Sequence, residues 1–196
     1  MFKKALKFIV HALSLILVFP VFLLYLIIGT VSDKDQVFSS TVQFLSLLPG
    51  VLGSYIRVAF FRLSLDKCEQ DIFIGFGTLF SQRHTELGHG VYIGPQGNIG
   101  KCRIEKNCLL GSGVHIMSGK QQHNFTSLET PIRDQGGHFE SITVGEDSWI
   151  GNGSLIMASV GKKCIVGAGS VVSKDIPDYS IVTGNPARII KSRLEE

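Results

Sequence analysis

The segment from 117 to 143 concentrates the side chains that could do chemistry. Its ionisable and amide residues include Lys120, His123, Asn124, Glu129, Arg133, Asp134, His138 and Glu140. Long loops held by a rigid scaffold are where proteins commonly build sites. Histidine suits proton transfer near neutral pH, because its unperturbed pKa is about 6.5. The side chains of this segment, the two histidines included, are therefore candidates for a functional site, although they are also typical of solvated loop side chains.

A six-residue period on both sides of this segment indicates what would position it. Aliphatic residues recur at Val144, Ile150, Ile156, Val160, Val166 and Val172, and earlier at Ile74, Leu87, Ile93, Ile99, Ile104 and Leu110, with Phe80 a weaker match. Helices repeat every three to four residues and ordinary strands every second, so neither explains this period. Hexapeptide repeats predict an all-β parallel β-helix, with 117–143 projecting from it. The unit 156–159 is two residues short, and 81–86 and 99–104 are irregular.

The N-terminal region predicts membrane helices. Phe8–Val31 is apolar and follows three lysines, and a bilayer core takes about 20 apolar residues to cross. A retained membrane helix explains this better than a cleaved signal peptide, whose apolar region would be shorter. Val37–Ile56 is a second uncharged stretch, broken at Pro49-Gly50 and followed by Arg57, Arg62 and Lys67. Those cations predict a spanning or re-entrant segment that returns to the cytoplasm; the alternative is an interfacial helix under a single span, which leaves the coil outside.

Composition agrees with one solenoid and a membrane region. Among 196 residues only 18% are charged, the net charge is +3, and there are 22 Gly and 13 Phe. The cations form no basic stripe with interleaved aromatics, so we expect no nucleic-acid partner. The predicted domains are 1–66 for the membrane helices, 67–190 for the β-helix with its loop, and 191–196 for a C-terminal tail. Four cysteines without a CxxC pair or Cys/His cluster predict buried side chains and no metal.

The repeats, the ending GAGSVVSKDIPDYSIVTGNPARII, the block VGEDSWIGNG and SGKQQH before the second repeat block resemble the hexapeptide-repeat acyltransferases. With two hydrophobic segments ahead of the coil, the chain is similar to membrane-associated members that O-acetylate bacterial exopolysaccharide or lipopolysaccharide sugars. The resemblance implies a left-handed parallel β-helix, acetyl-CoA as donor, a carbohydrate acceptor and a homotrimer with the CoA groove between subunits. It also implies the bacterial inner membrane, with the coil facing the cytoplasm.

The resemblance assigns roles to individual residues. His123 matches the general base, and the backbone N–H of Asn152 matches the oxyanion donor. Trp149 would lie along pantetheine, or pack on the neighbouring subunit. The residues that match cofactor-binding positions are Ser173, Lys174 and Arg188; those in the right loop for an acceptor sugar are Arg133, Asp134, Gln135, His138 and Glu140. The short unit 156–159 departs from the soluble maltose- and galactoside-type enzymes, so contacts near Ser159 are not carried over.

Two other functions fit parts of the sequence. A γ-type carbonic anhydrase shares this fold and binds zinc through three histidines, for which His84, His89 and His115 are candidates. Their order is the reverse of the pattern in that family, and a membrane anchor would be unusual there. A non-catalytic scaffold in polysaccharide assembly would need only the coil, and would neither bind CoA nor depend on His123.

Overall fold

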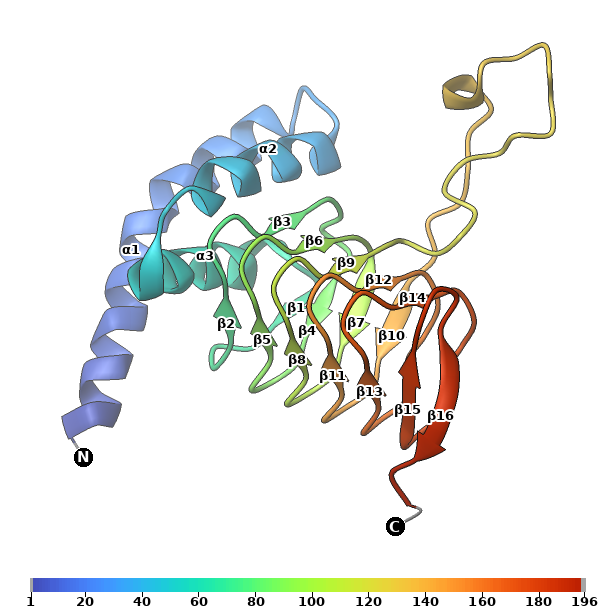
Figure 1. Ribbon diagram of the computed structural model, residues 1–196. Helices are drawn as coiled ribbons and strands as arrows, with labels where there is room; N and C mark the ends of the chain where they lie inside the picture. The colour runs from blue at the N-terminus through green and yellow to red at the C-terminus, as the bar shows by residue number, and fades with distance from the viewer. Residues whose placement is uncertain (1, 195–196) are drawn as a thin grey trace.

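The computed structural model describes the backbone of residues 2–194 and the side chains of residues 5–194. Sixteen strands form a coil of three parallel sheets, apart from one antiparallel edge, as Figure 1 shows. Sheet A contains β1 (Lys67–Cys68), β4 (Glu86–Leu87), β7 (Cys102–Ile104) and β10 (Ile142–Val144). Sheet B contains β2 (Phe73–Ile74), β5 (Tyr92–Ile93), β8 (Leu109–Leu110), β11 (Trp149–Ile150), β13 (Ile165–Val166), β15 (Ser180–Thr183) and β16 (Arg188–Ser192). Sheet C contains β3 (Leu79–Phe80), β6 (Asn98–Ile99), β9 (His115–Ile116), β12 (Leu155–Ile156) and β14 (Val171–Val172).

The second residue of nearly every short strand points into the coil. The aliphatic residues predicted from the repeat are all at most 2% exposed, and so is Phe80. In sheet B the interior column runs from Ile74 through Ile93, Leu110, Ile150 and Val166 to Val182, in register. The six-residue period therefore arises because each unit supplies one side of the triangle, and the predicted parallel β-helix is confirmed.

Two corners of the triangle are regular and the third is variable. The A-to-B and B-to-C corners turn through residues with positive φ, such as Asn107 and Gly113, in successive coils. The third corner, from sheet C to sheet A, contains the irregular spacings at 81–86 and 99–104 and also the short unit 156–159. Val160, which follows the short unit, continues sheet A through single bridges to Val144 and Ile176. The segment 117–143 is inserted at this same corner, between β9 and β10. The short unit is thus a tight corner that keeps the register.

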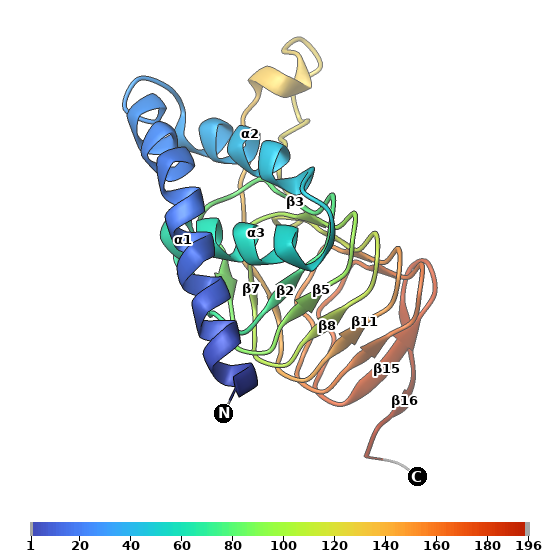
Figure 2. The same cartoon turned by 90° about the vertical axis from the view of Figure 1, so that its left-hand side faces the viewer.

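Three helices precede the coil: α1 (Phe2–Ile28), α2 (Lys34–Ser46) and α3 (Gly50–Ser64). Asp33 caps α2, because its side chain accepts a hydrogen bond from the N–H of Gln36 at 2.8 Å. Pro49 precedes α3, at the break expected from Pro49-Gly50. α3 packs on β1 and β2 and α2 packs on β3, so these helices cover the first turn of the coil (Figure 2).

Both ends of the solenoid are capped, as an exposed strand edge would otherwise offer unpaired backbone groups. At the first turn, the N–H of Ile74 donates to Ser54 Oγ at 3.0 Å. The carbonyl of Ile74 accepts from Arg57 Nε and Nη2 at 3.2 and 2.8 Å. At the last turn, β16 pairs antiparallel with β15. α3 thereby supplies the hydrogen bonds that a preceding coil would have made.

The two apolar stretches of the N-terminal region form helices of different kinds. Among the described residues, one helix, Ala5–Ile28, is long and apolar enough to cross a membrane. The second stretch forms α2 and the first half of α3, and its apolar residues Phe38, Val42 and Leu45 are buried against the protein. Hydropathy could not distinguish lipid contact from contact with the coil. The expected tail from 191 also begins inside β16, and its residues 195–196 lie outside the described residues.

Candidate active site

The insertion 117–143 projects from the coil as an arm, as Figure 1 shows in yellow. Its stem is antiparallel: Glu140 N–H donates to the Ser118 carbonyl at 3.0 Å, and His138 N–H donates to the Gln121 carbonyl at 2.8 Å. At the tip, the Gln135 amide bonds to backbone groups of Ser127 and Thr130 and closes the loop around the 3-10 turn η1 (Ile132–Asp134). The arm is an ordered element.

His123 lies on the first limb of this stem, and its side chain is exposed. Gly137 lies opposite: a Cβ there would be 1.9 Å from the Gln122 carbonyl oxygen and 2.9 Å from the His123 nitrogen. Only glycine therefore allows the two limbs to approach so closely at the candidate base. Lys120 Nζ donates to the Ser173 carbonyl at 3.0 Å and holds the base of the arm against the coil.

Asn152 lies at the B-to-C corner between β11 and β12. Its side-chain oxygen accepts from the Ser112 N–H at 3.1 Å, and its carbonyl accepts from Gly169 N–H at 2.8 Å. Within residues 2–194, its own N–H has no hydrogen-bond partner. A Cβ on Gly111 would lie 2.0 Å from Asn152 Oδ1, so glycine is needed for this corner to stack. The corner holds a solvent-exposed backbone donor in a fixed position, as an oxyanion site requires.

The chain places His123 and Asn152 at opposite ends of the strands of sheet C. The arm begins after β9, at the C-terminal ends of the strands of sheet C. Asn152 lies in the corner that leads into β12, at the N-terminal ends of those strands. One chain therefore does not bring the two predicted catalytic groups together across a single corner.

A groove of about 330 Å³ lies at the base of the arm, on the outer face of sheet C. Its polar lining includes Ser81, Asn98, His115 and Gln122. Asn98 and His115 are paired neighbours on β6 and β9, with their side chains facing outward. None of these residues was predicted as an acceptor or cofactor contact. The repeat register could have indicated Asn98 and His115, since each directly precedes an interior aliphatic residue.

Trp149 belongs to an apolar stripe on the outer face of sheet B. It is 52% exposed and lies in register between Leu109 and Ile165. The stripe continues to Tyr92 and Phe73, whose rings stack at 5.0 Å. This placement fits both interpretations of Trp149, as a contact for pantetheine and as a contact for a neighbouring subunit.

The predicted phosphate-binding residues are exposed at the late coils. Lys174 follows β14, next to Ser173, whose carbonyl already holds Lys120. Arg188 begins β16, opposite Thr183, and its Nη1 donates to the Ala187 carbonyl at 3.1 Å. Lys174 lies at the corner between sheets C and A. Arg188 lies after the C-terminal end of β15, where sheet B would lead into sheet C, so the two cations are at different corners of the coil.

The predicted acceptor residues are divided between the stem and the tip of the arm. His138 is in the stem, beside the limb that contains His123. Arg133 and Asp134 are at the tip, and their side chains pair with each other at 3.5 Å. Gln135 closes the tip through its hydrogen bonds, and Glu140 packs over Gly119 at the base. The tip residues are thus remote from the coil of their own chain.

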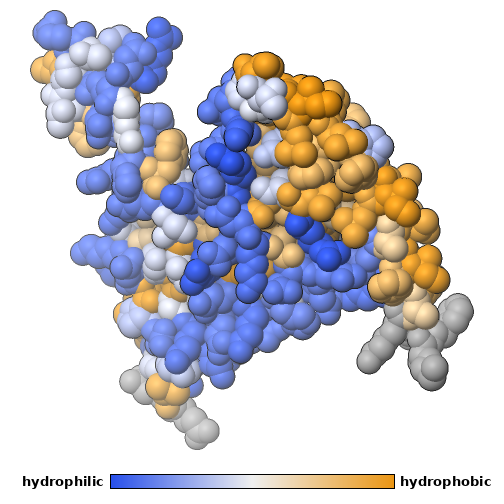
Figure 3. Space-filling view, turned by 180° about the vertical axis from the view of Figure 1, so that it is seen from behind, coloured by the Kyte–Doolittle hydropathy of each residue, from blue (hydrophilic) through white to orange (hydrophobic). Residues whose placement is uncertain are grey.

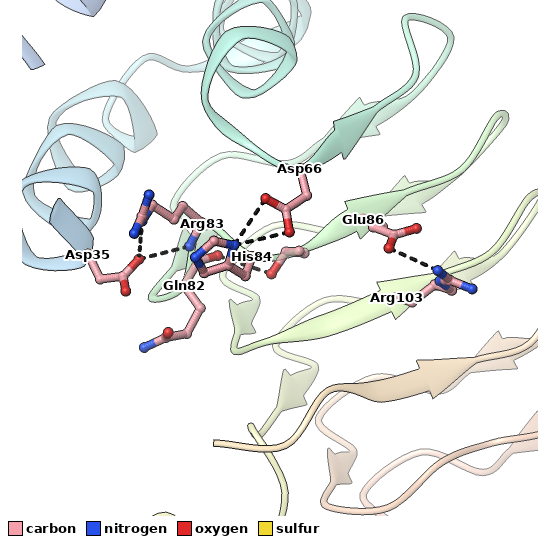
Figure 4. A network of polar contacts seen from close by, with 8 residues as sticks. Asp35, Asp66, Gln82, Arg83, His84, Glu86 and Arg103 are labelled. Atoms are coloured by element: carbon pink, nitrogen blue, oxygen red, sulfur yellow. Dashed lines mark hydrogen bonds and ion pairs between the residues drawn. The ribbon is translucent and has the colours of Figure 1, made fainter. Parts of the chain in front are cut away.

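The histidines proposed as alternative zinc ligands are separated. His84 Nδ1 lies 3.1 Å from Asp66 Oδ1, and Figure 4 shows it turned toward that carboxylate. His89 Nε2 lies 3.4 Å from Asp71 Oδ2, and His115 faces the groove on sheet C. In the part of the chain that the structure describes, no three His, Cys, Asp or Glu residues form a metal-binding cluster.

Comparison with known proteins supports this fold. A family model described as a hexapeptide repeat of succinyl-transferase matches residues 101–119 and 141–174. A probable acetyltransferase of Mycobacterium tuberculosis is 37% identical over 73 residues, or 36% of this chain and 24% of that protein. A chloramphenicol acetyltransferase of Agrobacterium fabrum is 31% identical over 121 residues, or 54% of this chain and 58% of that protein. The chain thus matches less than two thirds of the length of either relative.

Solved structures show the same coil. A maltose O-acetyltransferase from Clostridium difficile 630 superposes with a TM-score of 0.70 at 23% identity, over 81% of this chain and 86% of that one. A galactoside acetyltransferase in complex with coenzyme A gives a TM-score of 0.60 at 20% identity, over 82% and 81%. At these identities the likeness concerns the fold. The chain thus contains hexapeptide repeats, resembles acetyltransferases in sequence over about half of its length, and shares the parallel β-helix of the hexapeptide-repeat acyltransferases.

Proposed function

We propose that the protein is an acetyl-CoA-dependent O-acetyltransferase that modifies a sugar hydroxyl of a bacterial surface polysaccharide, or of its lipid- or nucleotide-linked precursor. The observation that carries the proposal is the ordered arm bearing His123, inserted into a hexapeptide coil between two repeat blocks. A scaffold would not need a glycine that closes the stem at the histidine.

The chemistry is a direct transfer in a ternary complex. The His123 imidazole removes the proton from the acceptor hydroxyl while that oxygen attacks the thioester carbonyl carbon. The resulting oxyanion accepts a hydrogen bond from the Asn152 N–H, a kind of contact worth about 3–4 kcal/mol in other enzymes. Collapse of the intermediate breaks the C–S bond, and the CoA thiolate takes the proton back from the imidazolium. No covalent enzyme intermediate is needed.

The active site is formed between subunits of a homotrimer. His123 and Asn152 are at opposite ends of the strands of sheet C. A site that uses both residues therefore combines the arm of one chain with the B-to-C corner of the next. The exposed stripe with Trp149 offers an apolar surface for such contact. Lys174 and Arg188, which lie at different corners of the coil, would bind the phosphates of one CoA from two chains.

The acceptor binds in the groove on sheet C, beside the base of the arm. Asn98, His115 and Gln122 offer amide and imidazole groups, which suit the hydroxyls of a sugar. His138 in the stem extends the same site, and Arg133 and Asp134 at the tip of the arm contribute to the site of a neighbouring subunit. We place the coil on the cytoplasmic side of the inner membrane, because acetyl-CoA is there.

Labelled acetyl-CoA incubated with glycan precursors tests the proposal, with the ester located by mass spectrometry and NMR. We expect His123→Ala to lower the rate roughly 10²–10⁴-fold without changing the unfolding midpoint. His84→Ala is the matched control, because His84 pairs with Asp66 at the first turn of the coil. Full activity in a correctly folded His123→Ala protein would contradict the mechanism.

A further inference from the structure

The polar and apolar sides of α1 are inverted relative to those of a helix in a soluble protein. From residue 5 onward, its buried polar side chains His11 and Ser14 face the protein together with Val18 and Tyr25. The outward side is apolar, including Phe8, Leu13, Ile16, Leu17, Phe19, Leu24 and Ile27, each at least 51% exposed. Surface helices of soluble proteins turn polar residues outward. This helix turns its polar residues inward, which indicates an apolar environment outside.

The apolar surface continues onto the neighbouring helices. Figure 3 shows it gathered over the helical end, whereas the coil is mainly hydrophilic. Phe44 of α2 lines a cleft with Leu24 and Ile28, and Val51 of α3 lines a cavity beside Lys7. Phe44 and Val51 are 63% and 62% exposed. Soluble proteins commonly expose single apolar side chains, but a contiguous apolar surface of this kind marks a site of contact with a membrane or a partner.

α1 is docked against the protein from Lys7 to Tyr25. Near its start Lys7 pairs with Asp71 of the coil, and the His11 ring meets Tyr55 of α3 at 4.8 Å. Near its end Tyr25 meets Phe60 of α3 at 5.6 Å. From Lys7 to Tyr25 the helix rises about 27 Å, close to the thickness of a bilayer core of about 30 Å.

This docking is incompatible with a transverse crossing. If α1 crossed the bilayer, α3 and the first turn of the coil would lie beside it in the hydrocarbon. Asp71 and His89 would enter the hydrocarbon near one end of α1. The ion pair of Asp35 with Arg83 Nε, 3.3 Å long and drawn in Figure 4, would enter near the other end. Ionised groups in a bilayer core are costly and are seldom exposed to lipid.

We propose that α1 lies in the plane of the membrane, with its outward face immersed in one leaflet. Interfacial helices sink about 5–10 Å in this way. Lys7 and Lys34 flank the apolar face at its two ends, where they can meet anionic headgroups; Lys34 packs over Gly29 at the end of α1. The N-terminus and the coil are then on the same side, and the protein does not span the bilayer.

Two measurements on the full chain test this proposal. In the first, protein purified in detergent is mixed with vesicles of phosphatidylethanolamine and phosphatidylglycerol, detergent is removed, and the vesicles are floated. We expect the wild type to float and Ile16→Glu/Leu24→Glu to lose more than about tenfold in partitioning, because two exposed apolar side chains become charged. The control is Leu128→Glu/Ile132→Glu on the arm, where both residues are also exposed.

In the second measurement, epitope tags at both ends are probed with protease in inverted and right-side-out bacterial membrane vesicles. We expect both tags to be cleaved in the same preparation. Tags on opposite sides would overturn the proposal in favour of a span. Wild-type protein that self-associates but does not float would overturn it in favour of a second copy covering the surface. Acetyl transfer to a soluble acceptor is measured separately, so that a failure of the proposed activity can be distinguished from a failure of membrane binding.

Discussion

Replacing Arg57 with methionine should destabilise the protein markedly. Arg57 is fully buried, has no carboxylate partner in the part of the chain described, and donates to three carbonyls. Burial lowers its pKa to about 10, so it stays charged at neutral pH. Of its acceptors, Leu45 keeps a donor in the Leu48 N–H, whereas Ile74 and Leu48 lose theirs. Each buried carbonyl left unsatisfied costs about 1–3 kcal/mol.

The two carbonyls together could cost about 2–6 kcal/mol, and removing a buried guanidinium relieves part of this through lower desolvation. We therefore expect a loss near 3 kcal/mol, which in a chain of this size lowers Tm by about 6–12 °C. Thermal unfolding of the full chain in detergent measures it, with Arg57→Lys as an intermediate variant in case Arg57→Met does not fold. The control is Arg62→Met on the same helix, where the arginine is exposed. Equal, small effects of both methionine variants would refute the role of Arg57 in capping the first strand.

Two further predictions concern charge. Lys174→Ala should raise KM for acetyl-CoA about 3–10-fold and leave kcat unchanged, because an exposed cation that binds phosphate contributes before and during the reaction alike; steady-state kinetics at varied acetyl-CoA measures this. Hydrogen bonding from Lys7 lowers the pKa of Asp71, so the carboxylate stabilises the fold above its unfolded pKa of about 3.9 and stops doing so as pH falls through its lower folded pKa. The Tm of the wild type should therefore exceed that of Asp71→Asn by only a few degrees from pH 8 to 5, and this difference should disappear below about pH 4. A Tm difference that grows as the pH falls would contradict the stabilising pair of Lys7 with Asp71.

The coil could be predicted from sequence because its energetics are local and periodic. Ile150 and Ile156 are buried and six residues apart, as are Val160 and Val166, so the spacing indicates which side chains point inward. The projecting arm was also predictable, because polar residues interrupt that period. His123 could be named only through the resemblance to a family, since an exposed loop histidine has no signature of its own.

The arrangement of the helices could not be predicted in the same way. Phe38 and Phe60 are as apolar as lipid-facing residues, and hydropathy does not record that they pack on each other at 6.1 Å. Arg57 was interpreted as a cation marking the cytoplasmic side, yet it is buried under the first strand. The separation of His123 from Asn152 also needed the corners to be assigned, because both are close to the second repeat block in sequence.

The central claim is that the arm of one chain completes the site at the corner of the next. Two inactive chains test it when coexpressed with different tags: His123→Ala, and Asn152→Pro, which removes the N–H; both are first checked for unfolding midpoint and trimer assembly. If sites form between subunits, random mixed trimers regain about a quarter of wild-type acetyl transfer, because a cyclic trimer then contains some intact pairs. If His123 and Asn152 act within one chain, mixed trimers stay as inactive as the parents, and that result would contradict the account.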